Sequence, residues 1–133
     1  NNYEITGLLV SRSNVQATVL RTPGQLYQKT DRGTITNLYN ISVINKTNRR
    51  YPITLRLLEP AVGRITLVGA TGLKLPAQGI TDGVFFAELP RTALHRTNQK
   101  IRIGLFSGGE LVSETSTKLR SAQHDRSKIQ KTP

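Results

Sequence analysis

The fold of this chain is decided by residues 35–44, which read Ile-Thr-Asn-Leu-Tyr-Asn-Ile-Ser-Val-Ile. Successive side chains of a β-strand point to opposite faces of the sheet, so a strand with one buried face alternates apolar and polar residues. Tyr39, Ile41 and Val43 fall on one such face, and polar residues separate them. We therefore expect a long strand that buries the face carrying Tyr39.

Shorter runs of the same kind occur on both sides of this stretch. They span residues 15–19, 53–57, 65–67, 84–87, 101–105 and 111–117. With residues 35–44 they give about seven short strands at a spacing of roughly 8–12 residues, which is typical of a β-sandwich. No window has sustained helical periodicity, and the best helix candidate, residues 91–96, is one turn at most. The sequence therefore predicts an all-β, immunoglobulin-like antiparallel β-sandwich.

Clusters of Gly, Pro, Asn and Asp separate the runs and predict turns. They lie at residues 22–24, 31–33, 45–48, 60, 69–72, 76–79 and 82–83. Gly108-Gly109 stands between two runs, and two glycines suit the positive φ angles of a two-residue hairpin. Pro52 opens its run, where the missing N–H is tolerated because the strand is starting or lies at an edge.

The length and composition fit one domain. We expect the sandwich to occupy residues 14–120, preceded by a lead-in of residues 1–13. Residues 121–133 contain a single aliphatic side chain beyond Ala122, so we expect a mobile basic tail. The chain begins without Met, which suggests a processed or excised chain, and its apolar runs are too short for a transmembrane helix or a signal peptide. The lack of Cys and Trp removes the hallmark of antibody domains, which the broader immunoglobulin-like class does not require.

The chain is strongly basic, with 19 Lys and Arg against 8 Asp and Glu and a net charge of +11. Such a balance raises the hypothesis of binding to nucleic acid or to an anionic membrane. The cations are spread from Arg12 to Lys131, and only four Tyr and three Phe are available for stacking on bases. This pattern favours a solvated basic surface, so no specific nucleic-acid partner is expected.

Arg49-Arg50-Tyr51 is the one compact basic-aromatic feature, and it follows the predicted turn at residues 45–48. Loops on a rigid sandwich often carry recognition. We interpret Arg49, Arg50 and Tyr51 as a candidate interaction patch for a partner protein or anionic headgroups. A merely solvated surface is an equal alternative.

The sequence offers little for catalysis or metal binding. Copper and iron–sulfur sites need thiolate, thioether or clustered imidazole ligands, and the chain has no Cys, no Met and two His. His95 stands beside Arg96, while His124-Asp125 falls in the expected mobile tail and is not preorganised. We therefore expect no catalytic residue, no cofactor-binding residue, no metal ligand and no small-molecule substrate in this chain.

Two acidic residues near the end of the chain, Glu110 and Glu114, are expected on one exposed face of one strand, where they would offset Lys118 and Arg120. No acidic pair has the convergence that acid–base catalysis needs. This arrangement predicts a surface role for both carboxylates.

Polar residues in the long central run admit both functional and structural readings. Asn45-Lys46-Thr47 and Asn40-Ile41-Ser42 match the N-glycosylation pattern. We favour a turn role for Asn45, whose side chain can bond its own backbone. For Tyr39, and likewise for Asn37, we favour a structural role in which the tyrosine ring packs inward and its hydroxyl bonds to backbone.

Three segments carry a resemblance to a known family. Residues 19–27, Val-Leu-Arg-Thr-Pro-Gly-Gln-Leu-Tyr, resemble a segment of the FixG/CcoG-type cytochrome oxidase accessory proteins. Residues 33–47 resemble a strand of that family ending in Asn-Lys-Thr, and residues 113–117, Ser-Glu-Thr-Ser-Thr, resemble the end of its last strand. The three occur in the same order and span most of the chain, while residues 61–99 match in strand pattern only.

The resemblance implies a place in a larger membrane protein. Members of that family have several transmembrane helices and a ferredoxin-like part with Cys-ligated iron–sulfur clusters, and they end in an immunoglobulin-like domain outside the cytoplasmic membrane. They support assembly of cbb-type haem-copper oxidases, with a proposed role in reducing copper. This chain would be the terminal, non-catalytic accessory domain on the periplasmic side, with residues 1–13 leading in from the membrane segment.

The same resemblance implies partners and an alternative. Oxidase subunits or maturation factors would be the partners, and iron–sulfur and copper-related activity would lie in the missing part of an iron–sulfur oxidoreductase. The alternative is a cell-surface or secreted immunoglobulin-like module that binds protein or glycan. A full-length gene without upstream membrane helices and Cys motifs would favour that alternative.

Overall fold

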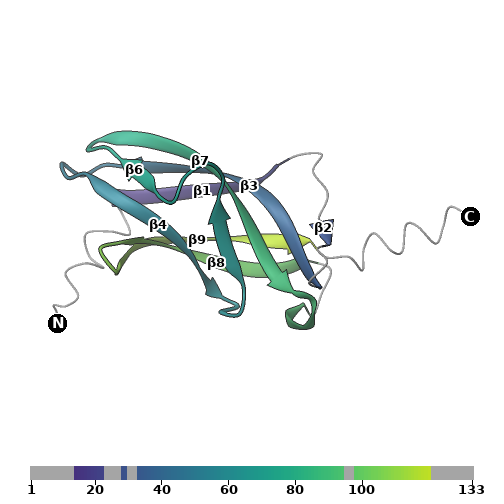
Figure 1. Ribbon diagram of the computed structural model, residues 1–133. Helices are drawn as coiled ribbons and strands as arrows, with labels where there is room; N and C mark the ends of the chain where they lie inside the picture. Colours follow the sequence, from purple (N-terminus) through teal and green to yellow (C-terminus); the bar gives the residue numbers. More distant parts are fainter. Residues whose placement is uncertain (1–13, 23–27, 30–32, 95–97, 121–133) are drawn as a thin grey trace, which may run out of the picture.

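The computed structural model describes residues 14–22, 28–29, 33–94 and 98–120. The lead-in expected at residues 1–13, the tail expected at 121–133 and the two histidines lie outside the described residues. Within them the chain forms two antiparallel sheets that face each other (Figure 1). No helix in this part of the chain has the length and apolarity that crossing a membrane requires.

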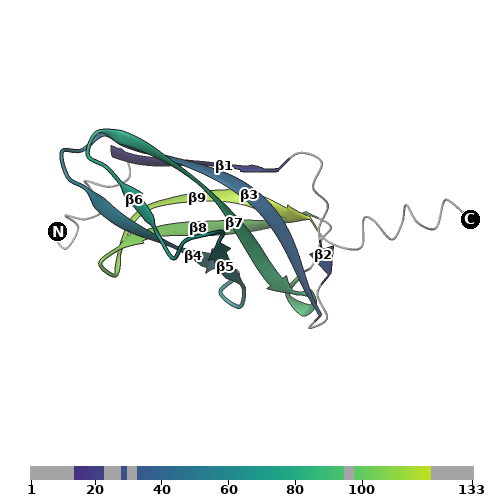
Figure 2. The same cartoon turned by 45° about the horizontal axis from the view of Figure 1, so that its top comes forward.

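The first sheet has the strand order β1-β3-β7-β5, and β2 pairs with β3 off this path. Its members are β1 (Val15–Arg21), β2 (Gln28–Lys29), β3 (Thr34–Asn45), β5 (Arg64–Leu67) and β7 (Gly79–Pro90). The second sheet has the order β6-β4-β8-β9. Its members are β4 (Tyr51–Glu59), β6 (Leu73–Leu75), β8 (Asn98–Ser107) and β9 (Glu110–Arg120), and a short 3₁₀ helix η1 (Arg91–Ala93) follows β7. Figure 2 shows the two layers from a second direction.

The predicted β-sandwich is confirmed, and each of the seven predicted runs falls within one strand. The described residues contain nine strands rather than about seven. The two additional strands, β2 and β6, have only two and three residues, so neither shows a periodic pattern. The single turn of helix expected after residue 90 is also present, as η1.

The core lies between the sheets and is built by the predicted alternation. Tyr39, Ile41 and Val43 of β3 are at most 1% exposed, and residues of β7 and β8 pack against them. The rings of Tyr39 and Phe85 stack with their centroids 5.1 Å apart. Burial of a large apolar side chain stabilises a fold by about 1.5–3 kcal/mol, so this layer anchors both sheets.

One predicted turn is wrong, because Asp82-Gly83 lies inside β7 and not between strands. Gly83 pairs with Ile41 of β3, and a Cβ atom on it would lie 2.9 Å from Cδ2 of Leu73. Gly inside a strand often marks a close approach by another element. Here the glycine makes room for β6 and does not turn the chain.

Two other local predictions are confirmed. Gly108 and Gly109 have φ angles of +60° and +86°, and they form the two-residue hairpin between β8 and β9. Pro52 pairs with Lys74 of β6, whereas the pairing of β4 with β8 begins only at Thr54. Pro52 therefore lies outside the hydrogen-bonded pairing of β4 with β8, so its missing N–H removes no bond from that pairing.

The expectation that Glu110 and Glu114 share one face is wrong. Phe106 pairs with Leu111 and Leu105 with Ser113, so one residue of β9 between them is extra. Such a bulge reverses the alternation of side chains beyond it. Glu114 consequently turns to the outer face of the second sheet, where it is half-buried and pairs with a neighbouring strand, while Glu110 stays exposed at the hairpin.

Candidate interaction surfaces

The turn between β3 and β4 is held by the side chain of Asn45. Its Oδ1 accepts hydrogen bonds from the backbone N–H of Thr47 at 2.9 Å and from the Thr47 hydroxyl at 2.7 Å. This is the self-bonded turn that the sequence predicts for Asn45. Asn45 is 1% exposed, so its side chain has no room for a glycan.

The same side chain links this turn to the loop between β6 and β7. The Nδ2 group of Asn45 donates to the carbonyl oxygens of Arg49 at 2.7 Å and Pro76 at 2.8 Å. From the other loop, the backbone N–H of Gln78 donates to the carbonyl of Thr47 at 2.9 Å. Both loops are therefore fixed to each other, and side chains that project from them start from a rigid base.

The predicted patch of Arg49, Arg50 and Tyr51 lies on this base. Both arginines are exposed, and the Arg49 guanidinium carbon lies 5.9 Å from the centre of the Tyr51 ring. That distance is at the outer limit for a cation–π contact. The structure thus brings Arg49 and Tyr51 together, and Arg50 and Tyr51 both line a groove.

The groove beside Tyr51 has a volume of about 560 Å³. It is lined by Arg50, Tyr51, Pro52, Lys74, Leu75 and Pro76. Half of this lining comes from β6 and the loop after it, which the sequence reasoning did not include. The signal that could have found it is the alternation Leu73-Lys74-Leu75 directly before Pro76, which is too short to stand out alone.

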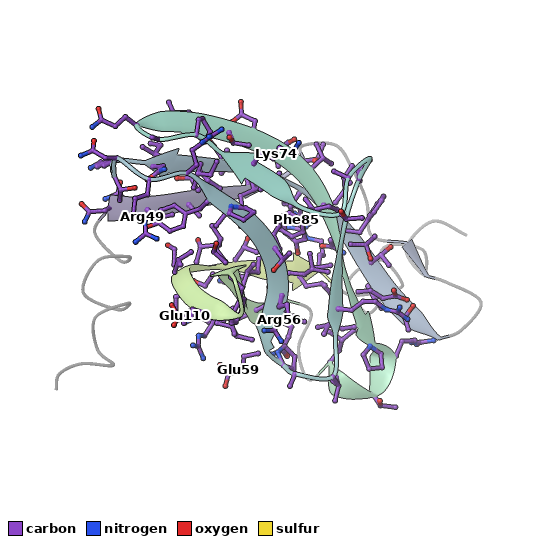
Figure 3. The ribbon with its side chains drawn as sticks, turned by 60° about the vertical axis from the view of Figure 1, so that its left-hand side comes forward. Arg49, Arg56, Glu59, Lys74, Phe85 and Glu110 are labelled. Atoms are coloured by element: carbon purple, nitrogen blue, oxygen red, sulfur yellow. The ribbon has the colours of Figure 1, made fainter. Side chains whose placement is uncertain are left out.

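Four exposed cations surround this end of the molecule, and we call them, with Tyr51, the basic tip. They are Lys46, Arg49, Arg50 and Lys74. None of the four has an ion pair with an acidic side chain of the described residues. Figure 3 looks towards this end, with Arg49 and Lys74 labelled.

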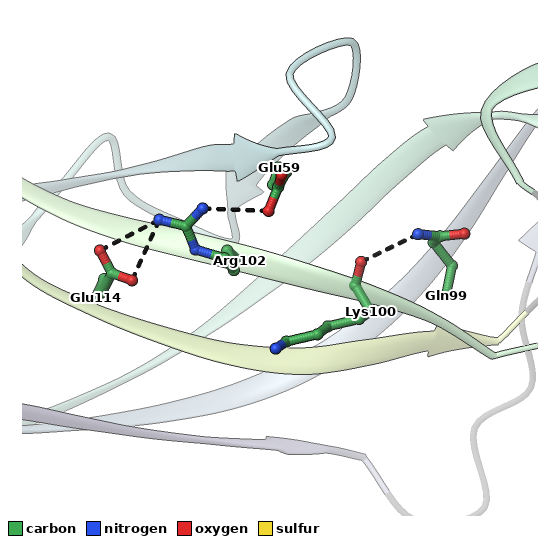
Figure 4. Close-up of polar contacts among 5 residues, drawn as sticks. All are labelled: Glu59, Gln99, Lys100, Arg102 and Glu114. Atoms are coloured by element: carbon green, nitrogen blue, oxygen red, sulfur yellow. Dashed lines mark hydrogen bonds and ion pairs between the residues drawn. The ribbon is translucent and has the colours of Figure 1, made fainter.

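The outer face of the second sheet differs, because Arg102 on it is paired with acidic side chains. Arg102 lies between two carboxylates, with Nη1 3.1 Å from Glu59 and Nη2 3.3 Å from Glu114 (Figure 4). The hydrogen bond that Arg102 donates to Glu59, followed by the negative charge of Glu114, raises the pKa of Arg102. On the same face the Arg56 guanidinium lies 4.2 Å from the centre of the Phe106 ring and covers it.

The outer face of the first sheet carries exposed apolar side chains, and we call it the open face. They are Leu20 (65% exposed), Ile44 (37%), Ile80 (61%) and Phe86 (37%). Ile44 pairs with Ile80 across β3 and β7, and a hollow of about 440 Å³ lies near Leu20 and Val84. The sequence reasoning missed this face because it assigned each strand one apolar side. Consecutive apolar residues such as Phe85-Phe86 were the available signal, since one of the two must face outward.

Asn37 and Tyr39 prove to be structural. Asn37 donates to the carbonyl of Arg120 at 3.1 Å and accepts from its N–H at 2.8 Å, and the Tyr39 hydroxyl donates to the carbonyl of Lys118 at 2.8 Å. These bonds join β3 of the first sheet to the edge strand β9 of the second. Burial raises the pKa of the Tyr39 hydroxyl, and the charge of Arg21 lowers it by less. The inward ring and backbone-bonded hydroxyl predicted for Tyr39 are confirmed.

The described residues hold no group of three His, Cys, Asp or Glu side chains that could bind a metal ion. Two surfaces stand out among the described residues: the rigid basic tip with its groove, and the open apolar face.

Comparison with known proteins agrees with this fold. The chain matches the family described as "IG-like fold at C-terminal of FixG, putative oxidoreductase" over residues 5–121. No curated protein sequence matches it. It is similar to the solved structure of a FixG-related protein from Vibrio parahaemolyticus, with a TM-score of 0.59 and 17% identity, over 82% of this chain and 97% of that one.

Two further solved structures are more distant. The N-terminal domain of PorA has a TM-score of 0.38 at 13% identity, over 77% of this chain and 96% of that one. The yeast GGA1 GAE domain has a TM-score of 0.42 at 12% identity, over 81% and 91%. Likenesses this weak carry no argument, and the first likeness supports the fold alone. The family match, however, covers all of the described sandwich, and this chain belongs to the family of immunoglobulin-like domains at the C-terminus of FixG.

Proposed function

We propose that this chain is a non-catalytic accessory domain through which a membrane-bound protein that assembles a cbb-type cytochrome oxidase contacts its partners. The observation that carries the proposal is the family match over residues 5–121, combined with the resemblance of residues 19–27, 33–47 and 113–117 to the oxidase accessory proteins. The domain would lie on the periplasmic side, tethered through membrane helices outside this chain.

The composition supports a division of labour between this domain and the rest of the protein. Iron–sulfur clusters are held by Cys thiolates, and copper handling also uses Cys, Met or clustered His. This chain has no Cys and no Met. In the proposal, electron transfer and any copper chemistry belong to the remainder of the full-length protein, and this domain supplies binding surface.

The surface proposed for oxidase subunits or maturation factors is the open face. The open face presents side chains such as Leu20 and Ile80, each more than half exposed, and exposed apolar patches on a folded domain commonly mark interaction sites. Within β1, β3, β5 and β7, Arg64 is the only cation at an outward position, and it pairs with Glu88 at 3.5 Å. A protein partner can therefore approach the open face with little repulsion, although the chain carries a charge of +11.

Site-specific cross-linking in membranes tests the proposal. A photoreactive residue replaces Leu20 on the open face of the full-length, membrane-anchored protein, and a matched control replaces Lys118 on the second sheet. We expect the Leu20 probe to capture oxidase subunits or maturation factors at low and at physiological salt, and the Lys118 probe to capture far less. Recovery of only abundant acidic proteins, lost at the higher salt, would remove the support for a docking role.

A further inference from the structure

We propose that the basic tip docks on an anionic membrane surface and so sets the sandwich end-on to the bilayer. The inference rests on the proposed function for the membrane tether, but its chemistry comes from the tip itself. The tip gathers four exposed cations, and no acidic side chain of the described residues forms an ion pair with any of them. Unpaired cations on a rigid base are complementary to a sheet of negative headgroups.

The tip is preorganised for such a surface. Asn45 ties the β3–β4 turn to Pro76, and Gln78 returns a side-chain hydrogen bond to Oδ1 of Asn48 at 2.6 Å. Cations on loops fixed in this way lose little conformational freedom when they meet headgroups. Lys46 and Arg49 on one loop and Lys74 beside the other therefore act as one charged platform.

Apolar side chains accompany these cations, as at the boundary between headgroups and acyl chains. Ile44 and Ile80 flank a hollow of about 350 Å³ that Lys46 also lines. On the other side, the half-buried ring of Tyr51 lies next to the exposed Pro52. Cations with aliphatic and Tyr side chains beside them are typical of interfacial binding.

The chain also enters the sandwich at this end. Val15 pairs with Asn45, and the backbone N–H of Lys46 donates to the carbonyl of Asn14 at 2.7 Å. Figure 1 shows the start of β1, the β3–β4 turn and the β8–β9 hairpin at the same end of the molecule. The family description places this domain at the C-terminus of FixG, so the rest of that protein precedes it. A tether that arrives here would hold the basic tip near the bilayer.

Two exposed acidic side chains of the described residues lie near this end, Glu110 and, two residues beyond Ile80 on β7, Asp82. Glu110 is exposed in the β8–β9 hairpin, on the second sheet (Figure 3). Together they reduce the positive charge of the end but leave the cations of the tip in excess.

Co-sedimentation of the 133-residue chain with vesicles tests the inference. The vesicles are phosphatidylcholine alone or phosphatidylcholine mixed with phosphatidylglycerol, at about 0.15 M salt, where screening acts beyond about 8 Å. We expect binding to the mixed vesicles only. Each cation near an anionic surface contributes about fivefold in affinity, so Arg49→Glu combined with Arg50→Glu should weaken binding by at least about 25-fold.

The matched control reverses two cations elsewhere. Lys100 and Lys118 are cross-strand neighbours on the outer face of the second sheet, so Lys100→Glu with Lys118→Glu gives the same net charge as the tip variant. We expect the control to lose much less binding. Equal losses in both variants, or no binding at this salt, would overturn the inference.

A second probe separates a membrane from an acidic protein partner. Soluble polyglutamate that bound the tip as tightly as the vesicles would overturn the membrane assignment in favour of an acidic polypeptide. The outcome is independent of the cross-linking experiment, because the Leu20 probe lies at the other hollow of the open face and not at the tip. If the chain does not bind vesicles but the cross-links to oxidase proteins form, only the membrane inference is wrong. If it binds vesicles but no such cross-links form, only the proposed function is wrong.

Discussion

The two outer faces of the sandwich follow the same alternation but treat their apolar residues differently. On the second sheet Arg56 covers Phe106, and a Cβ on Gly104 would lie only 2.7 Å from that ring, so the ring packs onto the glycine. On the first sheet Phe86 stays 37% exposed and Ile80 61% exposed. The difference teaches that the second sheet covers its outward aromatic ring within the domain, whereas the first sheet leaves its outward apolar side chains exposed.

The largest expected effect comes from the layer that both faces share. Phe85 is fully buried and stacks on Tyr39. Phe85→Ala should lower the free energy of unfolding by about 3–5 kcal/mol, because it removes the ring and leaves a cavity. Urea denaturation followed by far-UV circular dichroism measures this. A loss below about 1 kcal/mol would mean that the core is not organised around β3 and β7 as described.

The next effect separates the two faces directly. Phe106→Ala should cost about 1–3 kcal/mol of unfolding free energy, since its ring packs against Gly104 and beneath Arg56. Phe86→Ala, the matched change on the open face, should cost no more than about 0.5 kcal/mol, as is usual for surface positions. The same denaturation experiment compares the variants. Equal losses of unfolding free energy in the two variants would contradict the distinction between a covered ring on the second sheet and an exposed ring on the open face.

A smaller effect concerns pH. Burial raises the pKa of the Tyr39 hydroxyl in the folded state, so its contribution to stability is complete below the unfolded pKa of about 10 and is lost as pH rises above it. Tyr39→Phe should cost about 1 kcal/mol near neutral pH through the lost bond to Lys118. Above pH ~10 the variant should lose stability less steeply than the wild type. Parallel stability curves between pH ~8 and ~11 would contradict this.

The smallest effect tests whether the charge network on the second sheet matters. Arg102→Gln removes both pairs, to Glu59 and to Glu114. We expect a slight destabilisation that shrinks as salt is raised, because exposed ion pairs contribute little and are screened. Thermal unfolding at low and at high salt gives the comparison. A loss independent of salt would assign Arg102 a packing role.

The sequence predicted the features that a local pattern of residues encodes. The strand around Tyr39 and the Gly108-Gly109 hairpin followed from local rules, and so did the turn at Asn45. β6 was not predicted, because a run of three residues is too short to show a period. Its pairing with β4 is set by the tertiary fold. Gly83 was misread for the same reason, since only the packed structure shows that Leu73 occupies the space above it.

The candidate surfaces divide in the same way. Arg49, Arg50 and Tyr51 are adjacent in sequence and were visible as a patch. Lys74 joins them because β6 pairs with β4 and places Lys74 opposite Pro52, a contact between distant residues that no local pattern encodes. The bulge in β9 likewise depends on pairing with β8, so the face of Glu114 could not be read from its spacing to Glu110.

The side chains that bridge the two sheets have a consequence for the association of one copy of the domain with another. At the outer edge of β9, the carbonyls of Lys118 and Arg120 are already bonded to Tyr39 and Asn37, and the Ser113 hydroxyl donates to the carbonyl of Val15 in β1 at 2.7 Å. An unpaired edge is a template on which a second chain can add a strand. Because these backbone groups are satisfied from within, a second copy that added a strand along β9 would first have to break the bonds at Lys118 and Arg120. This end of β9 is therefore a poor template for polymerisation through the edge of the sheet.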